Sequence, residues 1–117
     1  VLLALGVASG AFGAHALRNR VDAYLIGVWE KAVLYHFLHA LALLLVPMLV
    51  RLQLCSPQGG HKACLAFFIG LLLFSGSLYL LVLTGTRGLG AVTPIGGIAF
   101  IAGWALLALD LSRVPHN

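Results

Sequence analysis

The chain has 117 residues, of which 62% are hydrophobic and only 9% are charged, and its net charge is +4. A soluble domain is about half apolar and about a quarter charged, so this composition excludes a water-soluble globule and indicates one domain embedded in lipid. The cations are scattered through short loops, which argues against nucleic acid as a partner and favours contacts with lipid headgroups.

The first hydrophobic segment covers residues 1–17 and stops at the polar run RNRVD. The chain begins at Val1 rather than Met, so we expect an N-terminal piece to precede it, and a cleaved signal peptide is the competing interpretation of this segment. Gly6, Gly10 and Ala14 lie four residues apart. This spacing of small residues lets another helix backbone come close.

The second segment, residues 28–54, carries a tyrosine and two histidines within its apolar run. Tyr35, His36 and His39 share a helix face about 100° wide. Side chains at this depth need polar partners, because lipid offers none. His15 ends the first segment, and we expect it at the same depth. The pattern therefore predicts one polar pocket formed by His15, Tyr35, His36 and His39.

Three interpretations of this pocket compete. The imidazoles could bond to neighbouring helices and lock the bundle. His36 and His39, at i and i+3, could bind a metal or haem together with His15. The pocket could also handle a proton or a small molecule, since histidine titrates near pH 6.5. No Cys or carboxylate stands at a convincing ligand spacing, so we assign no metal and no cofactor.

The third segment covers residues 63–83 and the fourth covers residues 91–111. The loop TGTRGLG between them lacks the spacing of a phosphate-binding motif and is interpreted as a turn. Gly96, Ala99 and Gly103 form a second small-residue edge in the fourth segment. We predict that it packs against the edge of Gly6, Gly10 and Ala14, which makes the first and fourth segments neighbours. Docking of another subunit is the alternative use of these edges.

Each segment has about the 20 residues that a helix needs to cross a bilayer, and short loops make successive helices antiparallel. The predicted fold class is therefore all-α, an integral membrane four-helix up-down bundle that forms a single domain over residues 1–117. Charge does not decide its orientation. The side with the N-terminus has three cations and the other side has four. They are Arg51, Lys62 and Arg113 against Arg18, Arg20, Lys31 and Arg87.

No catalytic constellation is present in the sequence, because Ser75 and Ser77 have no adjacent base. We therefore expect a non-enzymatic structural or accessory component of a membrane assembly, with the lipid bilayer and a homo-oligomer or larger membrane complex as partners. The alternative is a membrane protein that handles a small ligand, a proton or a metal through its intramembrane histidines.

Four motifs in order resemble one family of small membrane proteins. They are GAFGAHAL (10–17), YHFLHALALL (35–44), LFSGSLYLLVLTG (73–85) and VTPIGGIAFIAGWALL (92–107). The family is the bacterial "domain of unknown function 423" family, whose eukaryotic relatives are called transmembrane protein 256-like. The resemblance implies a multi-pass protein of the bacterial inner membrane and leaves its activity open. It also favours cytoplasmic N- and C-termini, and hence a cytoplasmic second loop with Cys55 and Cys64 as free thiols.

Overall fold

The structure, a computed structural model, describes residues 1–113, which form helices joined by short loops. The elements are α1 (Leu2–Phe12), η1 (Gly13–Leu17), α2 (Ala23–Arg51), α3 (Pro57–Gly70), η2 (Leu71–Ser75), α4 (Gly76–Thr84), η3 (Arg87–Ala91) and α5 (Thr93–Arg113). The π-helical turns η1 and η2 continue their neighbours, so α1–η1 and α3–η2–α4 are each one rod. The predicted all-α, four-helix up-down bundle is confirmed.

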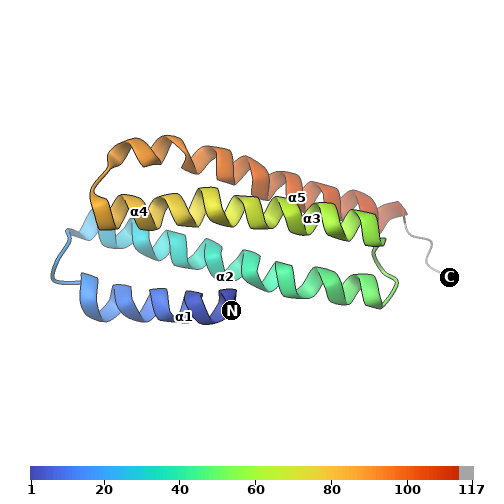
Figure 1. The fold of residues 1–117 in the computed structure, drawn as a ribbon, viewed down its shortest axis with the longest axis horizontal. Helices are drawn as coiled ribbons and strands as arrows, with labels where there is room; N and C mark the ends of the chain where they lie inside the picture. Colours follow the sequence, from blue (N-terminus) through green and yellow to red (C-terminus); the bar gives the residue numbers. More distant parts are fainter. Residues whose placement is uncertain (114–117) are drawn as a thin grey trace.

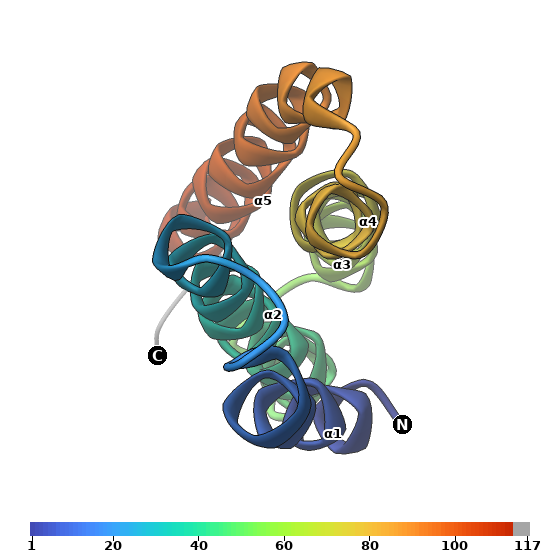
Figure 2. The same cartoon turned by 90° about the vertical axis from the view of Figure 1, so that its left-hand side faces the viewer.

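The rods lie side by side in a body that measures 56 × 26 × 17 Å (Figure 1). Seen along the rods, α1 lies at one end of the stack and α5 at the other, with α2 and the α3–α4 rod between them (Figure 2). Three of the rods are long and apolar enough to cross a membrane: Ala23–Arg51, Pro57–Thr84 and Arg87–Arg113. The first helix, Leu2–Leu17, is also apolar but spans only about 24 Å at 1.5 Å per residue.

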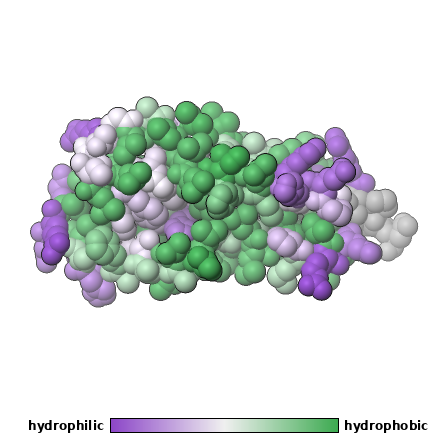
Figure 3. Space-filling model, viewed as in Figure 1, coloured by the Kyte–Doolittle hydropathy of each residue, from purple (hydrophilic) through white to green (hydrophobic). Residues whose placement is uncertain are grey.

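Hydrophobic residues cover most of the middle of the face shown in Figure 3, and hydrophilic residues gather at its two ends. This distribution is the one expected for a bundle that crosses a hydrocarbon layer between two aqueous phases. Large apolar side chains such as Ile98 and Ile101 are 67% and 70% exposed. Lipid is the solvent that such a surface requires.

Two helices begin earlier than the sequence pattern predicted. α2 starts at Ala23 rather than residue 28, because the Asp22 side chain accepts a hydrogen bond from the Leu25 N–H and caps the helix. α3 starts at Pro57 rather than residue 63, because Ser56 caps it and proline suits a first helical position. Polar residues therefore belong to these helices, although hydropathy alone assigned them to loops.

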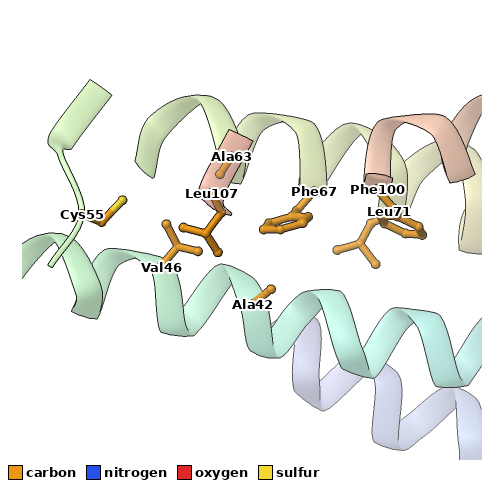
Figure 4. Close-up of a cluster of buried hydrophobic side chains, with 8 residues drawn as sticks. All are labelled: Ala42, Val46, Cys55, Ala63, Phe67, Leu71, Phe100 and Leu107. Atoms are coloured by element: carbon orange, nitrogen blue, oxygen red, sulfur yellow. The ribbon is translucent and has the colours of Figure 1, made fainter. Parts of the chain in front are cut away.

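One hydrophobic cluster joins α2, α3 and α5 (Figure 4). Its buried members are Ala42, Val46, Cys55, Ala63, Phe67, Leu71, Phe100 and Leu107. A second cluster, made of Leu17, Trp29, Leu81 and Val82, joins the loop end of η1 to α2 and α4. The two clusters together fix the order of the rods.

The small-residue edge of α5 packs on the α3–η2 rod. Gly96 is buried so close to the backbone of Leu73 and Phe74 that a β-carbon at this position would collide with the Phe74 nitrogen. Gly103 is buried against the Phe67 ring, whose nearest atom would lie 2.6 Å from an added β-carbon. Ala99, between them, is half-buried. These close approaches explain why α5 lies along α3.

The predicted pairing of the first and fourth segments is wrong, because α1 packs on α2 instead. An added β-carbon at Gly6 would lie 3.0 Å from the Phe37 ring, and one at Gly10 would lie 3.6 Å from Val33. Ala14 is exposed. The short connection after η1 folds α1 back onto α2, which then stands between α1 and α5 (Figure 2).

Candidate functional site

His39 is a buried crosslink between α2 and α5. Its Nδ1 lies 2.9 Å from the Tyr35 carbonyl oxygen, which can only accept, so Nδ1 carries the proton and donates. Its Nε2 then accepts the indole N–H of Trp104 at 3.0 Å. The imidazole also stacks on the Phe100 ring, with centroids 3.5 Å apart and planes 10° apart. Both nitrogens of a neutral His39 are therefore used within the protein.

His36 is buried on the other side of α2, towards α1 and α4. Its Nε2 donates to the Leu2 carbonyl oxygen at 2.8 Å. Its Nδ1 lies 2.9 Å from the Tyr79 hydroxyl, which donates to it when the ring is neutral. His36 thus ties three helices together, and its polar atoms are satisfied in the same way as those of His39.

Two buried serines complete this set of bonds between helices. The Ser75 hydroxyl, in η2, donates to the Ala32 carbonyl of α2 at 2.8 Å. The Ser77 hydroxyl, in α4, lies 2.7 Å from the Thr93 hydroxyl at the start of α5. Within residues 1–113, every buried side-chain nitrogen and oxygen has a hydrogen-bond partner. Hydrogen bonding of this completeness is what a lipid environment demands.

The structure does not bring the four predicted pocket residues together. Tyr35 and His39 line a crevice between α2 and α5. His36 lines a separate, smaller cavity near Leu2 and Tyr79. His15 is exposed. The three histidines therefore do not share one cavity.

The error concerns the predicted depth of His15. α1 runs antiparallel to α2, with Leu2 beside His36 and Gly13 beside Trp29. His15 follows Leu2 by 13 residues, or about 20 Å of helix. The late start predicted for the second segment had placed His36 too near its beginning. In the described part of the chain, no three His, Cys, Asp or Glu residues are grouped closely enough to hold a metal ion.

Asp110, near the end of α5, forms a polar contact that the sequence pattern did not reveal. Its carboxylate accepts the Ser56 N–H at 2.7 Å and the Ser56 hydroxyl. The same hydroxyl accepts the Gly59 N–H at 3.0 Å, so Asp110 reinforces the cap of α3 from another helix. The available clue in the sequence was a lone carboxylate near the end of the last segment together with the helix-start signal Ser56-Pro57.

The two cysteines lie on either side of Ser56 in the sequence. Both are free in the structure, with Cys55 buried in the loop and Cys64 half-buried in α3. Burial, together with the negative charge of nearby Asp110, raises the pKa of the Cys55 thiol to about 11. Cys55 is therefore protonated and unreactive near neutral pH. The redox state of the pair in the cell stays a prediction.

Trp29 anchors α1 to α2 and was also missed by the sequence analysis. Its indole N–H donates to the Ser9 carbonyl at 2.7 Å. Its ring covers Gly13, where a β-carbon would collide with it. It also packs against Tyr79, with ring centroids 4.6 Å apart. The sequence shows Gly13 as a small residue, but it does not show that the Trp29 ring packs on it.

The chain is similar to several known membrane proteins. A family model described as "Protein of unknown function (DUF423)" matches residues 9–97. The UPF0382 membrane protein SSP2132 of Staphylococcus saprophyticus is 43% identical over 110 residues, covering 94% of this chain and 89% of that protein. The UPF0382 membrane protein YwdK of Bacillus subtilis is 43% identical over 108 residues, covering 92% and 85%. No solved structure matches. The apolar bundle, the family match and the two relatives together show that the chain belongs to the DUF423 family of membrane proteins.

Proposed function

We propose that this protein is a non-enzymatic structural or accessory component of an assembly in the bacterial inner membrane. One observation carries the proposal. The buried polar side chains His36, His39, Ser75 and Ser77 are all hydrogen-bonded to other helices. Groups held in this way stabilise a rigid bundle rather than attack or protonate a substrate.

Exposed apolar residues on two flanks of the bundle support the proposal that it binds a partner. α1 packs on α2 along one side, while Leu5 and Val7 are 52% and 62% exposed. On the opposite edge of the stack, Ile98 of α5 is 67% exposed. A short bundle with two such flanks can bind another copy or a larger membrane protein through either flank.

Photo-crosslinking in native membranes tests this role. A photoreactive amino acid is placed at Ala8, on the exposed side of α1, or at Ile98 of α5, with buried Ala32 as the matched control. We expect a discrete protein adduct from one exposed position and none from Ala32. Lipid adducts alone, together with a monomeric native mass in mild detergent, would contradict the assembly role.

The proposed orientation places the termini and the loop before α3 in the cytoplasm. Its test replaces exposed Gln58 or exposed Asn19 with cysteine in a chain whose Cys55 and Cys64 are alanine. A membrane-impermeant maleimide applied to spheroplasts should label Asn19→Cys and spare Gln58→Cys. The opposite pattern would reverse the orientation.

A further inference from the structure

A crevice of about 430 Å³ lies between α2 and α5. α5 packs closely on α3 and η2, but it meets α2 through side chains such as the Trp104–His39 pair. The aromatic walls of the crevice are Tyr35, His39, Phe74, Phe100 and Trp104. At its rim, Leu38 and Ile101 are 48% and 70% exposed, so the crevice opens sideways towards lipid.

Three of the wall rings, those of Tyr35, His39 and Phe100, are nearly parallel, while the Phe74 and Trp104 rings are tilted against them. The Tyr35 and Phe100 rings are nearly parallel, with planes 14° apart and centroids 6.1 Å apart. His39 stacks on Phe100, as described above. Rings favour planar guests that can stack against their faces. The volume lies within the range of about 300–1,000 Å³ that small-molecule sites occupy.

One polar group in the crevice lacks a protein partner. His39 uses both nitrogens, and Trp104 uses its N–H. The Tyr35 hydroxyl, by contrast, takes part in no hydrogen bond within residues 1–113, where Tyr35 bonds only through its backbone carbonyl. Tyr35 is the thirteenth residue of the 29-residue α2, near the middle of the span. Acyl chains supply no acceptor there, so a ligand that brings one gains a hydrogen bond.

We propose that this crevice binds a planar, lipid-soluble ring compound with a carbonyl oxygen, the chemistry of a membrane quinone. The carbonyl accepts the Tyr35 hydroxyl, the ring stacks among the aromatic walls, and an apolar tail leaves between Leu38 and Ile101. The site binds this compound without transferring electrons. It is independent of the proposed accessory role, because it uses the α2–α5 crevice rather than the exposed flanks.

The experiment uses the full chain in nanodiscs and a 1,4-naphthoquinone with one isoprenyl tail as the probe. Quinones quench indole fluorescence, and Trp104 lies in the crevice wall. We expect saturable quenching that a saturated branched hydrocarbon of similar length does not reverse. If the hydrocarbon displaced the quinone equally well, the crevice would be a groove for acyl chains and the proposal would be overturned.

Two variants locate the site. Tyr35→Phe removes only the hydroxyl and should weaken the quinone Kd about three- to tenfold, the value of one hydrogen bond. Gly97→Leu should abolish saturable quenching, because its side chain enters the crevice. The nearest atom to a β-carbon at position 97 is Phe74 Cδ2, at 3.9 Å. Gly90→Leu, outside the crevice, is the matched control and should bind like the wild type.

Unchanged affinity in both Tyr35→Phe and Gly97→Leu would overturn the proposal. A wild-type chain that binds no quinone would also overturn it. If, in addition, Gly97→Leu changed the chain from dimer to monomer, the occupant of the crevice would be a second copy of the chain. Helical circular dichroism and melting check that each variant is folded. If Gly97→Leu were unfolded, the Tyr35→Phe affinity alone would decide.

Discussion

The η2–α5 contact and the α1–α2 contact both use glycines, but in different ways. In the first, Gly96 of α5 lies against the backbone of η2. In the second, Gly6 and Gly10 of α1 lie against side chains of α2, the Phe37 ring and Val33. A backbone inside a packed rod cannot move aside, whereas a side chain can tilt or change rotamer. The same sequence pattern therefore produces a rigid contact at one edge of the stack and an adaptable one at the other.

The largest effect is expected at the backbone contact. Gly96→Ala should lower the free energy of unfolding by about 2 kcal/mol, because the new β-carbon meets Leu73 and Phe74 backbone atoms. Unfolding in mixed detergent and SDS measures it. The neighbouring Gly97→Ala is the control and should change stability by less than about 0.5 kcal/mol, since its nearest neighbour is at 3.9 Å. Equal losses would remove the distinction between the two contacts.

A smaller loss is expected where α5 meets α2 through side chains alone. Trp104→Phe keeps a ring but removes the N–H that His39 Nε2 accepts. Hydrogen bonds between membrane helices contribute about 0.6–1.7 kcal/mol, so we expect a loss of about 1 kcal/mol. A double-mutant cycle with His39→Leu measures the coupling. A coupling energy near zero would show that this bond does not hold α5.

Gly6→Ala tests the adaptable contact directly. The β-carbon would lie 3.0 Å from the Phe37 ring, which is half-buried and can tilt. Alanine is also about 1 kcal/mol better than glycine in a helix, which offsets the crowding. We expect a net loss of about 0.5 kcal/mol in the same unfolding assay. A loss as large as that of Gly96→Ala would make both contacts equally rigid.

The smallest effect is expected at Gly10. The nearest atom to a new β-carbon is Val33 Cγ1 at 3.6 Å, an ordinary van der Waals distance. Gly10→Ala should therefore leave the free energy of unfolding unchanged or raise it by about 0.5 kcal/mol through helix propensity. A clear loss on equilibrium unfolding would mean that α1 approaches α2 more closely at this point than the structure shows.

The sequence predicted the fold class because composition and segment length alone decide it. An apolar chain with runs of about 20 residues and short loops has few alternatives to a helical bundle. The starts of α2 and α3 were also predictable, because Asp22 and Ser56 before them are ordinary capping residues. They were missed because hydropathy was used to place the boundaries.

The neighbours of each helix could not be predicted in this way. A glycine edge such as that of Gly6 and Gly10 shows that something comes close, but not which helix does so. The face shared by Tyr35, His36 and His39 likewise does not reveal which helices pack on it. It is wide enough to serve two neighbours, so His36 faces α1 and α4 while His39 faces α5. Only the packed structure separates them.

The π-helical turn η2 has a consequence for insertions and deletions. A π turn holds one residue more than regular helical winding does, so the residues after it are rotated by about 100° relative to an unbroken α-helix. Ser77 and Tyr79 reach Thr93 and His36 with this extra rotation. Deleting one residue from 71–75 would return the turn to regular α-helical winding and leave Ser77 and Tyr79 facing their partners. This rod therefore tolerates the loss of one residue within η2, whereas the same loss within the regular helix α4 would rotate the side chains after it by about 100°.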